Sequence, residues 1–153
     1  MNQQIEQLII EIKKVIKGKD DVIAKIIMAI LASGHILLED NPGLGKTTLA
    51  KALAKATQMY TNRIQFTPDT MPSDILGYSM YSKESGDMEF ISGPVFTNLL
   101  LADEINRTSS KTQAALLEAM AEATVTIDNQ TYCLPDPFIT CLLYTSPSPR
   151  DCS

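Results

Sequence analysis

The sequence predicts an α/β fold in which helices cover a parallel sheet. A short apolar run at residues 36–38, preceded by His35, is typical of a buried strand, and the unbroken apolar run at 99–102 fits a strand that is buried on both faces. Each run is followed by a segment that is typical of a helix, at residues 47–56 and 111–123. Alternation of buried strands with helices favours a parallel sheet over an antiparallel one.

Length and composition fit one globular domain or part of one. The 153 residues are 44% apolar and 20% charged, the balance of a chain that buries a core. No apolar run reaches the ~18 residues that a membrane-spanning helix needs, and no secretory signal is visible. The net charge of −5 argues against a general nucleic-acid-binding surface. Three cysteines without metal-ligand spacing favour free thiols in the cytoplasm: Cys133, Cys141 and Cys152.

The N-terminal part is expected to be helical. Residues 3–17 carry apolar side chains at helical spacing, and Gly18 is a candidate C-terminal cap. Asp20 or Asp21 can then cap the start of a second helix. His35 could contact a ligand, but at the start of a strand a histidine is more often structural, so we leave it out of the site.

The first chemical motif is the loop between the strand at 35–38 and the helix that follows. Gly43 and Gly45 permit a tight turn whose backbone N–H groups form an anion site at a helix N-terminus. Lys46 can reach β- and γ-phosphate oxygens, and the Thr47 hydroxyl is placed to hold Mg²⁺. The alternative is a glycine-rich turn before an ordinary helix. We predict a phosphate-binding loop (Walker A motif) made by Asp40, Asn41, Pro42, Gly43, Leu44, Gly45, Lys46, Thr47 and Thr48.

One position of this loop departs from the consensus Gly-x-x-x-x-Gly-Lys-Ser/Thr. Asp40 stands where the consensus has its first glycine. A carboxylate there either weakens phosphate binding or occupies the strand exit with its side chain directed away. The residues alone leave both readings open.

The second chemical motif is the carboxylate pair Asp103-Glu104, which follows the apolar run at 99–102. In open α/β sheets, ligands bind at the carboxyl ends of the strands. We expect Asp103 to hold Mg²⁺ through its water shell and Glu104 to polarise the water that attacks the γ-phosphate (a Walker B motif). An ordinary strand end can have the same residues, but the phosphate loop upstream favours the functional interpretation.

The middle of the chain predicts a strand, a loop and a hairpin. A second short strand is expected at Arg63–Phe66, followed by a polar loop at 67–74 that its prolines make hard to continue as helix or strand. Residues 77–81 and 88–91 form a β-hairpin pattern with its turn near Ser85-Gly86. This hairpin is either plain scaffold or, if its Tyr and Met side chains are exposed, a contact surface for a partner.

The last third predicts a helix, a hairpin and a further core strand. Ser109 or Ser110 with Gln113 can cap a helix from Lys111 to Ala123. A hairpin with its turn at 128–130 follows, and Phe138–Thr140 begin a strand. The helix is expected to direct three side chains inward: Ala114, Leu117 and Met120.

The chain resembles the MoxR group of AAA+ ATPases over nearly all of residues 10–140. The stretch 63–77 and the run Asp-Glu-Ile-Asn-Arg that ends at Arg107 are far more specific than a phosphate loop alone. The other matching stretches are 35–48, 93–96 and 111–120.

The resemblance implies a AAA+ core with a β-hairpin insert at 78–92 that faces the working surface of a hexameric ring. It also implies ATP bound with Mg²⁺ between subunits, and ATP-driven, chaperone-like remodelling or maturation of partner proteins, often ones with a von Willebrand A domain. Residues 15–18 match the segment that lies against adenine, so Ile16 and Gly18 are expected at the nucleotide. An acidic residue at position 40 is similar to a variant that the family tolerates.

The end of the chain departs from the family pattern. The family would continue into a strand with a sensor Asn, an arginine finger and a helical lid. Residues 141–153 instead contain Pro147 and Pro149, which a central strand excludes. We expect a partial AAA+ core at 1–140, truncated before its last core strand and lid. The tail at 141–153 resembles translated cloning or adapter sequence, and the alternative is a genuine disordered tail.

These observations predict that the intact protein hydrolyses ATP, with Lys46 and Glu104 as its catalytic residues. Arg107 either contacts a neighbouring subunit or the nucleotide, or forms a surface salt bridge. One alternative is a fragment that binds nucleotide without hydrolysis, because the arginine finger and sensor are missing. The other is a AAA+ ATPase that acts on DNA, against which the acidic charge and the 63–77 stretch argue.

Overall fold

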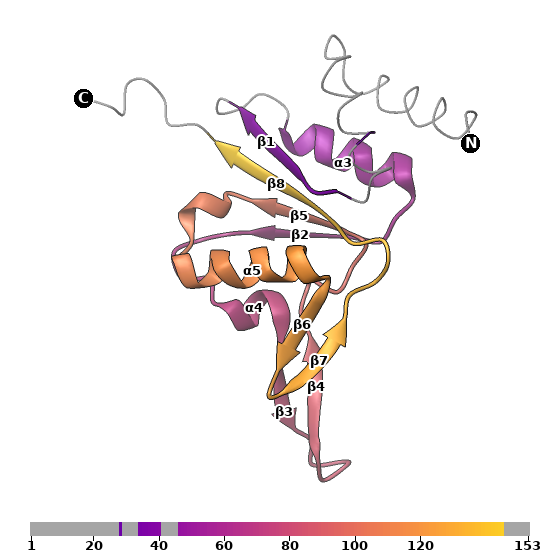
Figure 1. The fold of residues 1–153 in the computed structure, drawn as a ribbon, viewed down its shortest axis with the longest axis vertical. Helices are drawn as coiled ribbons and strands as arrows, with labels where there is room; N and C mark the ends of the chain where they lie inside the picture. The colour runs from indigo at the N-terminus through magenta and orange to yellow at the C-terminus, as the bar shows by residue number, and fades with distance from the viewer. Residues whose placement is uncertain (1–27, 29–33, 41–45, 146–153) are drawn as a thin grey trace.

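The computed structural model describes residues 28, 34–40 and 46–145, and the helices expected before His35 lie outside the described residues, apart from Met28. The described strands form one parallel sheet of four strands and two antiparallel hairpins (Figure 1). The order in the sheet is β1 (Ile36–Asp40), β8 (Ile139–Thr145), β5 (Leu99–Asp103) and β2 (Thr61–Gln65). The α/β prediction with a parallel sheet is therefore confirmed.

The strand β5 lies inside this sheet, between β8 and β2. Its four apolar residues, 99–102, are all buried, as the unbroken hydrophobic run predicts. Leu100 and Ala102 pack in one core cluster with Leu116 and Ala119 of the helix α5 (Ser110–Glu122). Because side chains alternate along a strand, Leu101 and Asp103 are directed to the opposite face.

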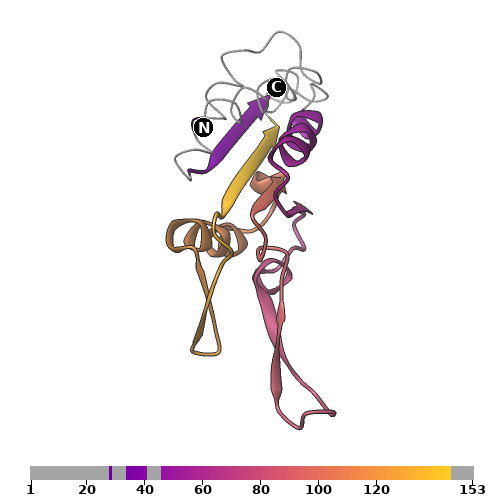
Figure 2. The same ribbon diagram turned by 90° about the vertical axis from the view of Figure 1, so that its right-hand side faces the viewer.

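Helices cover both faces of the sheet. The helix α3 (Lys46–Thr57) lies on one side and α5 on the other (Figure 2). The short helix α4 (Pro72–Leu76) packs beside α5, and its Ile75 belongs to the α5-side core. None of the helices within the described residues is long and apolar enough to cross a membrane.

The helix α4 corrects the expectation of a continuous loop at 67–74. Pro72 occupies the first turn of α4, where its missing N–H costs nothing and its fixed φ suits a helix. Met71 is the N-cap, and its backbone N–H donates to Oδ2 of Asp74 (2.8 Å). Proline therefore begins a helix here instead of excluding one.

The inward face predicted for α5 is correct for Met120, which packs against the core cluster, and wrong for Ala114 and Leu117. The side chain of Leu117 is 53% exposed, and Ala114 is exposed as well. The buried residues are Thr112, Leu116 and Ala119. Thr112 is buried because its hydroxyl donates to the carbonyl oxygen of Thr70 (2.8 Å), and a pattern built only on apolar residues misses such a position. The N-cap was predicted correctly, since Oγ of Ser109 accepts the N–H of Thr112.

The strand β8 runs through the predicted domain boundary at residue 140. Residues 141–145 pair with β1 on one side, and residues 139–143 pair with β5 on the other. The strand ends at Thr145, two residues before Pro147, so the prolines do not interrupt it. The first five residues of the segment 141–153 therefore belong to the sheet.

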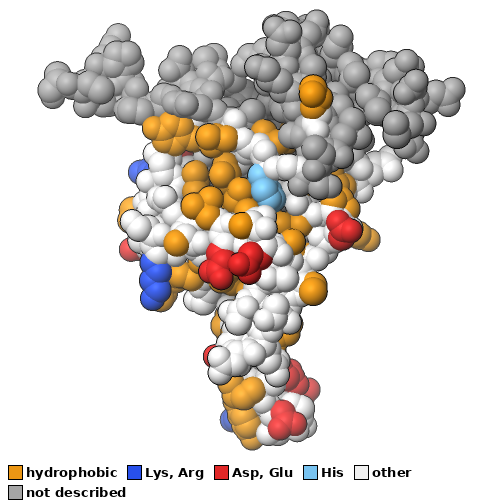
Figure 3. Space-filling model, in the orientation of Figure 1, with side chains coloured by type: hydrophobic (Ala, Val, Ile, Leu, Met, Phe, Trp, Pro, Cys, Tyr) orange, Lys and Arg blue, Asp and Glu red, His pale blue; other side chains and the backbone are white. Residues whose placement is uncertain are grey.

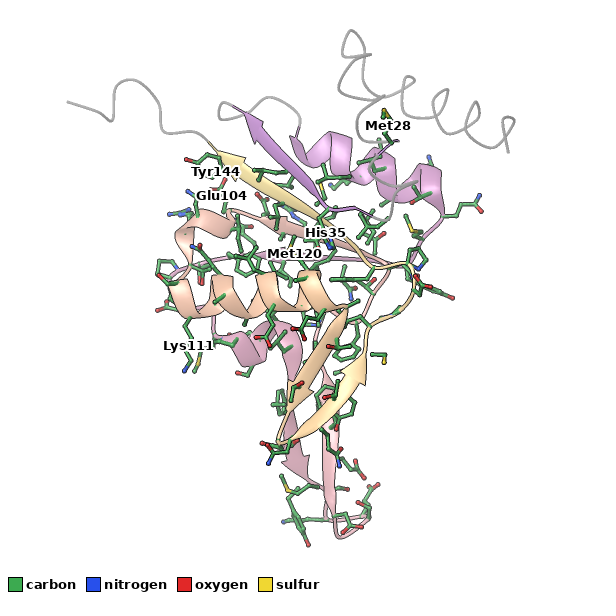
Figure 4. All side chains as sticks on the ribbon, in the orientation of Figure 1. Met28, His35, Glu104, Lys111, Met120 and Tyr144 are labelled. Atoms are coloured by element: carbon green, nitrogen blue, oxygen red, sulfur yellow. The ribbon has the colours of Figure 1, made fainter. Side chains whose placement is uncertain are left out.

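The single histidine has a structural role, as expected. Nδ1 of His35 accepts the backbone N–H of Thr140 (3.0 Å), and Nε2 lies 2.9 Å from the carbonyl oxygen of Met120 (Figure 4). The ring also contacts Phe138 edge-on. These contacts join the start of β1 to α5 and to the start of β8.

Two hairpins extend from the body below the sheet in Figure 1: β3 (Gly77–Tyr81) with β4 (Met88–Ser92), and β6 (Thr124–Ile127) with β7 (Gln130–Cys133). Both were predicted. Asp128 and Asn129 have φ of 50° and 64°, as a two-residue hairpin turn of type I′ requires. The rings of Phe90 and Tyr132 stack with centroids 4.1 Å apart and join the two hairpins.

The base of the hairpin β3–β4 is a close backbone crossing between two glycines. A Cβ added to Gly93 would overlap the carbonyl oxygen of Ile75 and lie 2.6 Å from the backbone nitrogen of Gly77. Gly77 has φ of +103° and the same crowding against Ile91. At the tip, Gly86 has φ of +73° but open space around it.

Candidate nucleotide site at the carboxyl edge of the sheet

The candidate site lies at the edge where the parallel strands end. Asp40 of β1 pairs with Thr145 of β8, and Gln65 of β2 pairs with Asp103 of β5. Because all four strands run in the same direction, these residues lie along one edge. Open α/β sheets bind their ligands at this edge.

A strand–loop–helix unit supplies one side of the site. The strand β1 ends at Asp40 and the helix α3 begins at Lys46, so the flanking elements of the predicted phosphate loop are confirmed. The N-terminus of α3 therefore follows directly on the loop, which favours binding of an anion there. Residues 41–45 lie outside the described residues, as do Ile16 and Gly18. Of Asp40, Lys46, Thr47 and Thr48 the structure describes the backbone.

The carboxylate of Asp103 supplies the opposite side. It lies on the same face of the sheet as α3, opposite the face where Leu100 and Ala102 pack on α5. Its side chain is 13% exposed, and Oδ2 accepts a hydrogen bond from Nη2 of Arg63 at 2.6 Å. Arg63 is on β2 and its side chain is 41% exposed. A carboxylate sheltered from bulk water thus lies on the α3 face at the edge where that helix begins.

Glu104 has an unusual backbone conformation at the point where β5 ends. Its φ of 59° and ψ of 43° are left-handed, which costs a non-glycine residue on the order of 1–3 kcal/mol. Its N–H donates to the carbonyl oxygen of Leu143 (2.9 Å), and its own carbonyl accepts the N–H of Arg107 (3.0 Å). Strained backbone of this kind concentrates at functional sites. Figure 4 shows Glu104 close to the end of β8, where Tyr144 lies.

The segment after β2 is folded onto the end of β5. The N–H of Phe66 donates to the carbonyl oxygen of Asp103 (2.9 Å), which extends the strand pairing by one residue. The carbonyl oxygen of Thr70 accepts two hydroxyl groups, from Thr108 (3.3 Å) and Thr112 (2.8 Å). The stretch 63–77 is therefore hydrogen-bonded both to the end of β5 and to the segment 108–112 that follows it.

The donor chemistry of this edge fits a triphosphate bound with Mg²⁺. In the described part of the chain, no three His, Cys, Asp or Glu side chains gather as a metal site of their own. Mg²⁺ in nucleotide sites usually takes one or two protein oxygens, phosphate oxygens and water, so a single sheltered carboxylate beside a phosphate loop suits it. The residues that would hold the group are Thr47, Asp103 and the loop amides.

Sequence reasoning missed Arg63 as part of the site. It was predicted only as the start of a strand, because the register between β2 and β5 cannot be derived from composition or periodicity. Arg107 lies in the 3₁₀ turn η1 (Ile105–Arg107) and is exposed. The structure describes no ion pair of its guanidinium with another described residue.

The comparisons with known proteins all indicate the same family. Residues 35–148 match the family model described as "ATPase family associated with various cellular activities (AAA)". The match extends beyond the predicted boundary at residue 140.

Individual relatives agree with this match. The chain is 53% identical over 127 residues to the uncharacterized protein YeaC of Bacillus subtilis, covering 83% of this chain and 40% of that protein. It is 42% identical over 135 residues to the chaperone MoxR1 of Mycobacterium tuberculosis, covering 88% of this chain and 36% of that protein. A crystal structure of a candidate ATPase from Cytophaga hutchinsonii superposes with a TM-score of 0.80 at 43% identity, covering 96% of this chain and 44% of that one. The chain thus spans less than half the length of these relatives.

Proposed function

Since the chain belongs to the MoxR family of AAA+ ATPases, we propose that it binds ATP with Mg²⁺ and that the intact protein hydrolyses ATP. The observation that carries this proposal is the carboxyl edge of the sheet. There the strained Glu104 and the sheltered Asp103 lie at the end of β5, at the same edge as the junction between β1 and α3.

Each residue has a role that its chemistry suits. Lys46 and the amides of residues 43–48 bind the phosphate oxygens at the start of α3. Thr47 and Asp103 hold Mg²⁺, which when bound neutralises charge on the phosphates. Glu104 orients the attacking water and accepts its proton. Asp40, Asn41 and Pro42 complete the loop, and Ile16 and Gly18 contact the adenine.

A protein client and a ring assembly belong to the same proposal. The exposed Tyr and Met side chains of the hairpin β3–β4 support a role in contacting a client, since apolar side chains are exposed on both faces of this hairpin (Figure 3). They are Tyr78, Met80, Tyr81 and Met88. We propose that the intact protein works as a hexamer in the cytoplasm, on clients that include proteins with a von Willebrand A domain.

Two substitutions test the nucleotide chemistry. Lys46→Ala is expected to abolish ATP binding, because it removes the cation that contacts the β- and γ-phosphates. Glu104→Gln is expected to retain ATP binding and to lower the hydrolysis rate by about 100-fold or more, because the amide cannot accept the proton. Binding is measured by titration calorimetry and hydrolysis by phosphate release at high protein concentration.

The matched control is Lys51→Ala, which removes an exposed lysine from the same helix α3. It should behave as the unmodified chain. Full hydrolysis by the Glu104→Gln variant would contradict the role of Glu104. ATP binding without any phosphate release by the unmodified chain would leave a nucleotide-binding function alone, and stimulation of hydrolysis by DNA would favour an enzyme that acts on DNA.

A further inference from the structure

We propose that Arg63 is a positioning residue for the carboxylate of Asp103, and that it sets how much Mg²⁺ the nucleotide site requires. The inference rests on the proposed function, because it assigns a role to Arg63 within the same site. Arg63 is not part of either chemical motif, and it reaches the site from the neighbouring strand β2.

The register of the sheet gives this pair its geometry. Arg63 pairs with Leu101 and Gln65 pairs with Asp103 across the parallel strands β2 and β5. Arg63 and Asp103 therefore lie on the same face, two residues apart along the strand direction. The long arginine side chain spans this diagonal and brings Nη2 to 2.6 Å from Oδ2.

The backbone on both sides of the pair is held in place. The hydrogen bond from Phe66 N–H to the carbonyl oxygen of Asp103 fixes the two strands just beyond the pair. Glu104 N–H donates to the carbonyl oxygen of Leu143, which fixes the end of β5 against β8. Because both backbones are fixed, the carboxylate can still rotate about its side-chain bonds. The hydrogen bond from Arg63 restricts this rotation.

The chemistry of the pair suits a positioning role. Arg63 donates to one oxygen, Oδ2, and a carboxylate has a second oxygen that can face a metal-bound water. Groups that hydrogen-bond to a ligating carboxylate orient it, and losing them usually lowers metal affinity by about 10–100-fold. Arg63 is more exposed than Asp103, so the carboxylate is the more sheltered partner, whose orientation the pair restricts.

Two other roles make different predictions. An ion pair that serves stability alone would leave the Mg²⁺ requirement unchanged on removal. If Arg63 instead competed with Mg²⁺ for the carboxylate, removing Arg63 would lower the Mg²⁺ concentration that the site requires. The sign of the change therefore distinguishes all three.

The experiment follows binding of a fluorescent ATP analogue to the 153-residue chain, first with EDTA and then during a Mg²⁺ titration. For Arg63→Gln we expect affinity in EDTA within about twofold of the unmodified chain. The Mg²⁺ concentration that gives half of the gain in affinity should rise about tenfold. Arg63→Lys keeps a cation but loses the planar fork, so it should fall between the two. Lys111→Gln, which removes an exposed cation from α5, is the control and should leave the titration unchanged.

Each outcome either supports or overturns the inference. An unchanged or lowered Mg²⁺ requirement in Arg63→Gln would overturn the inference while the proposed function stands. If Arg63→Gln does not fold, Arg63→Lys decides by the same criterion, a raised requirement supporting the inference. Failure of the unmodified chain to bind the analogue under either condition would overturn the proposed function, and the inference with it.

Discussion

The central sheet and the two hairpins use strands in opposite ways. In the sheet, the inner strands β5 and β8 bury most of their side chains, and polar groups lie at one edge, where backbone hydrogen bonds hold Asp103 and Glu104. In the hairpins, antiparallel strands pair with a single neighbour, and most of their side chains are exposed. The sheet therefore suits chemistry that needs fixed geometry. The hairpins suit contact with another molecule, because substitutions of their exposed side chains cost the fold little.

The largest expected difference between the two regions concerns thiol reactivity. Cys141 is buried in β8, and burial raises its pKa to about 12, whereas Cys133 is exposed on β7. At pH 8 only about one part in 10⁴ of Cys141 is thiolate, and the thiolate of Cys141 becomes abundant only as the pH approaches 12. In a Cys152→Ser background, iodoacetamide should modify Cys133 at least about 100-fold faster than Cys141, as peptide mass spectrometry can follow. Equal rates would contradict the position of β8 inside the sheet.

Truncation of side chains should separate the regions by stability. Leu100→Ala removes a fully buried side chain from the α5-side core and should lower the free energy of unfolding by about 2–5 kcal/mol. Met80→Ala, on the exposed hairpin, should change it by less than about 0.5 kcal/mol. Urea unfolding followed by circular dichroism measures both. Similar losses for the two variants would show that the hairpin is as tightly integrated as the sheet.

Within one hairpin, the base and the tip should differ. Gly93→Ala adds a methyl group that overlaps the backbone at the crossing, so it should cost about 3 kcal/mol. Gly86→Ala meets no neighbour and pays only for its positive φ, about 1 kcal/mol. The midpoints of thermal unfolding should follow this order. A harmless Gly93→Ala would mean that the crossing opens easily.

The smallest expected effect tests the strain at the site. Both Glu104→Gly and Glu104→Ala remove the carboxylate, but only glycine adopts the left-handed conformation without penalty. The glycine variant should therefore be more stable than the alanine variant by about 1 kcal/mol, although neither should hydrolyse ATP. Urea unfolding of both variants measures the difference. An alanine variant of equal or greater stability would show that the backbone here is not strained.

Much of the fold follows from local patterns in the sequence. The strands β1 and β5 are predictable from unbroken apolar runs, and the hairpins from their alternation and turns. The strand before the phosphate loop and the helix after it are predictable from the same kind of pattern. The inward face of α5 was predictable only in part: Met120 packs on the core as expected, but the face also includes the polar Thr112, whose partner lies 42 residues away.

Local sequence patterns do not determine the register between strands that are far apart in the sequence. The pair of Arg63 with Asp103 depends on how β2 lies against β5, and these strands are far apart in sequence. The end of β8 is another such case, since the prolines after it suggested that the strand stops earlier. A foreign origin of the segment 141–153 stays a prediction, which sequencing the source DNA across residues 135–153 would test.

The position of β8 has a consequence for the order of folding. It is the last of the described strands in the chain, yet it lies between β1 and β5. Among the described strands, β1 is made first, and its one partner in the described sheet, β8, follows about a hundred residues later. Contacts of such long range form slowly and leave unpaired strand edges exposed to association in the meantime. The pairing that fixes β1 in the described sheet, next to the proposed nucleotide site, therefore forms only after β8 has been made.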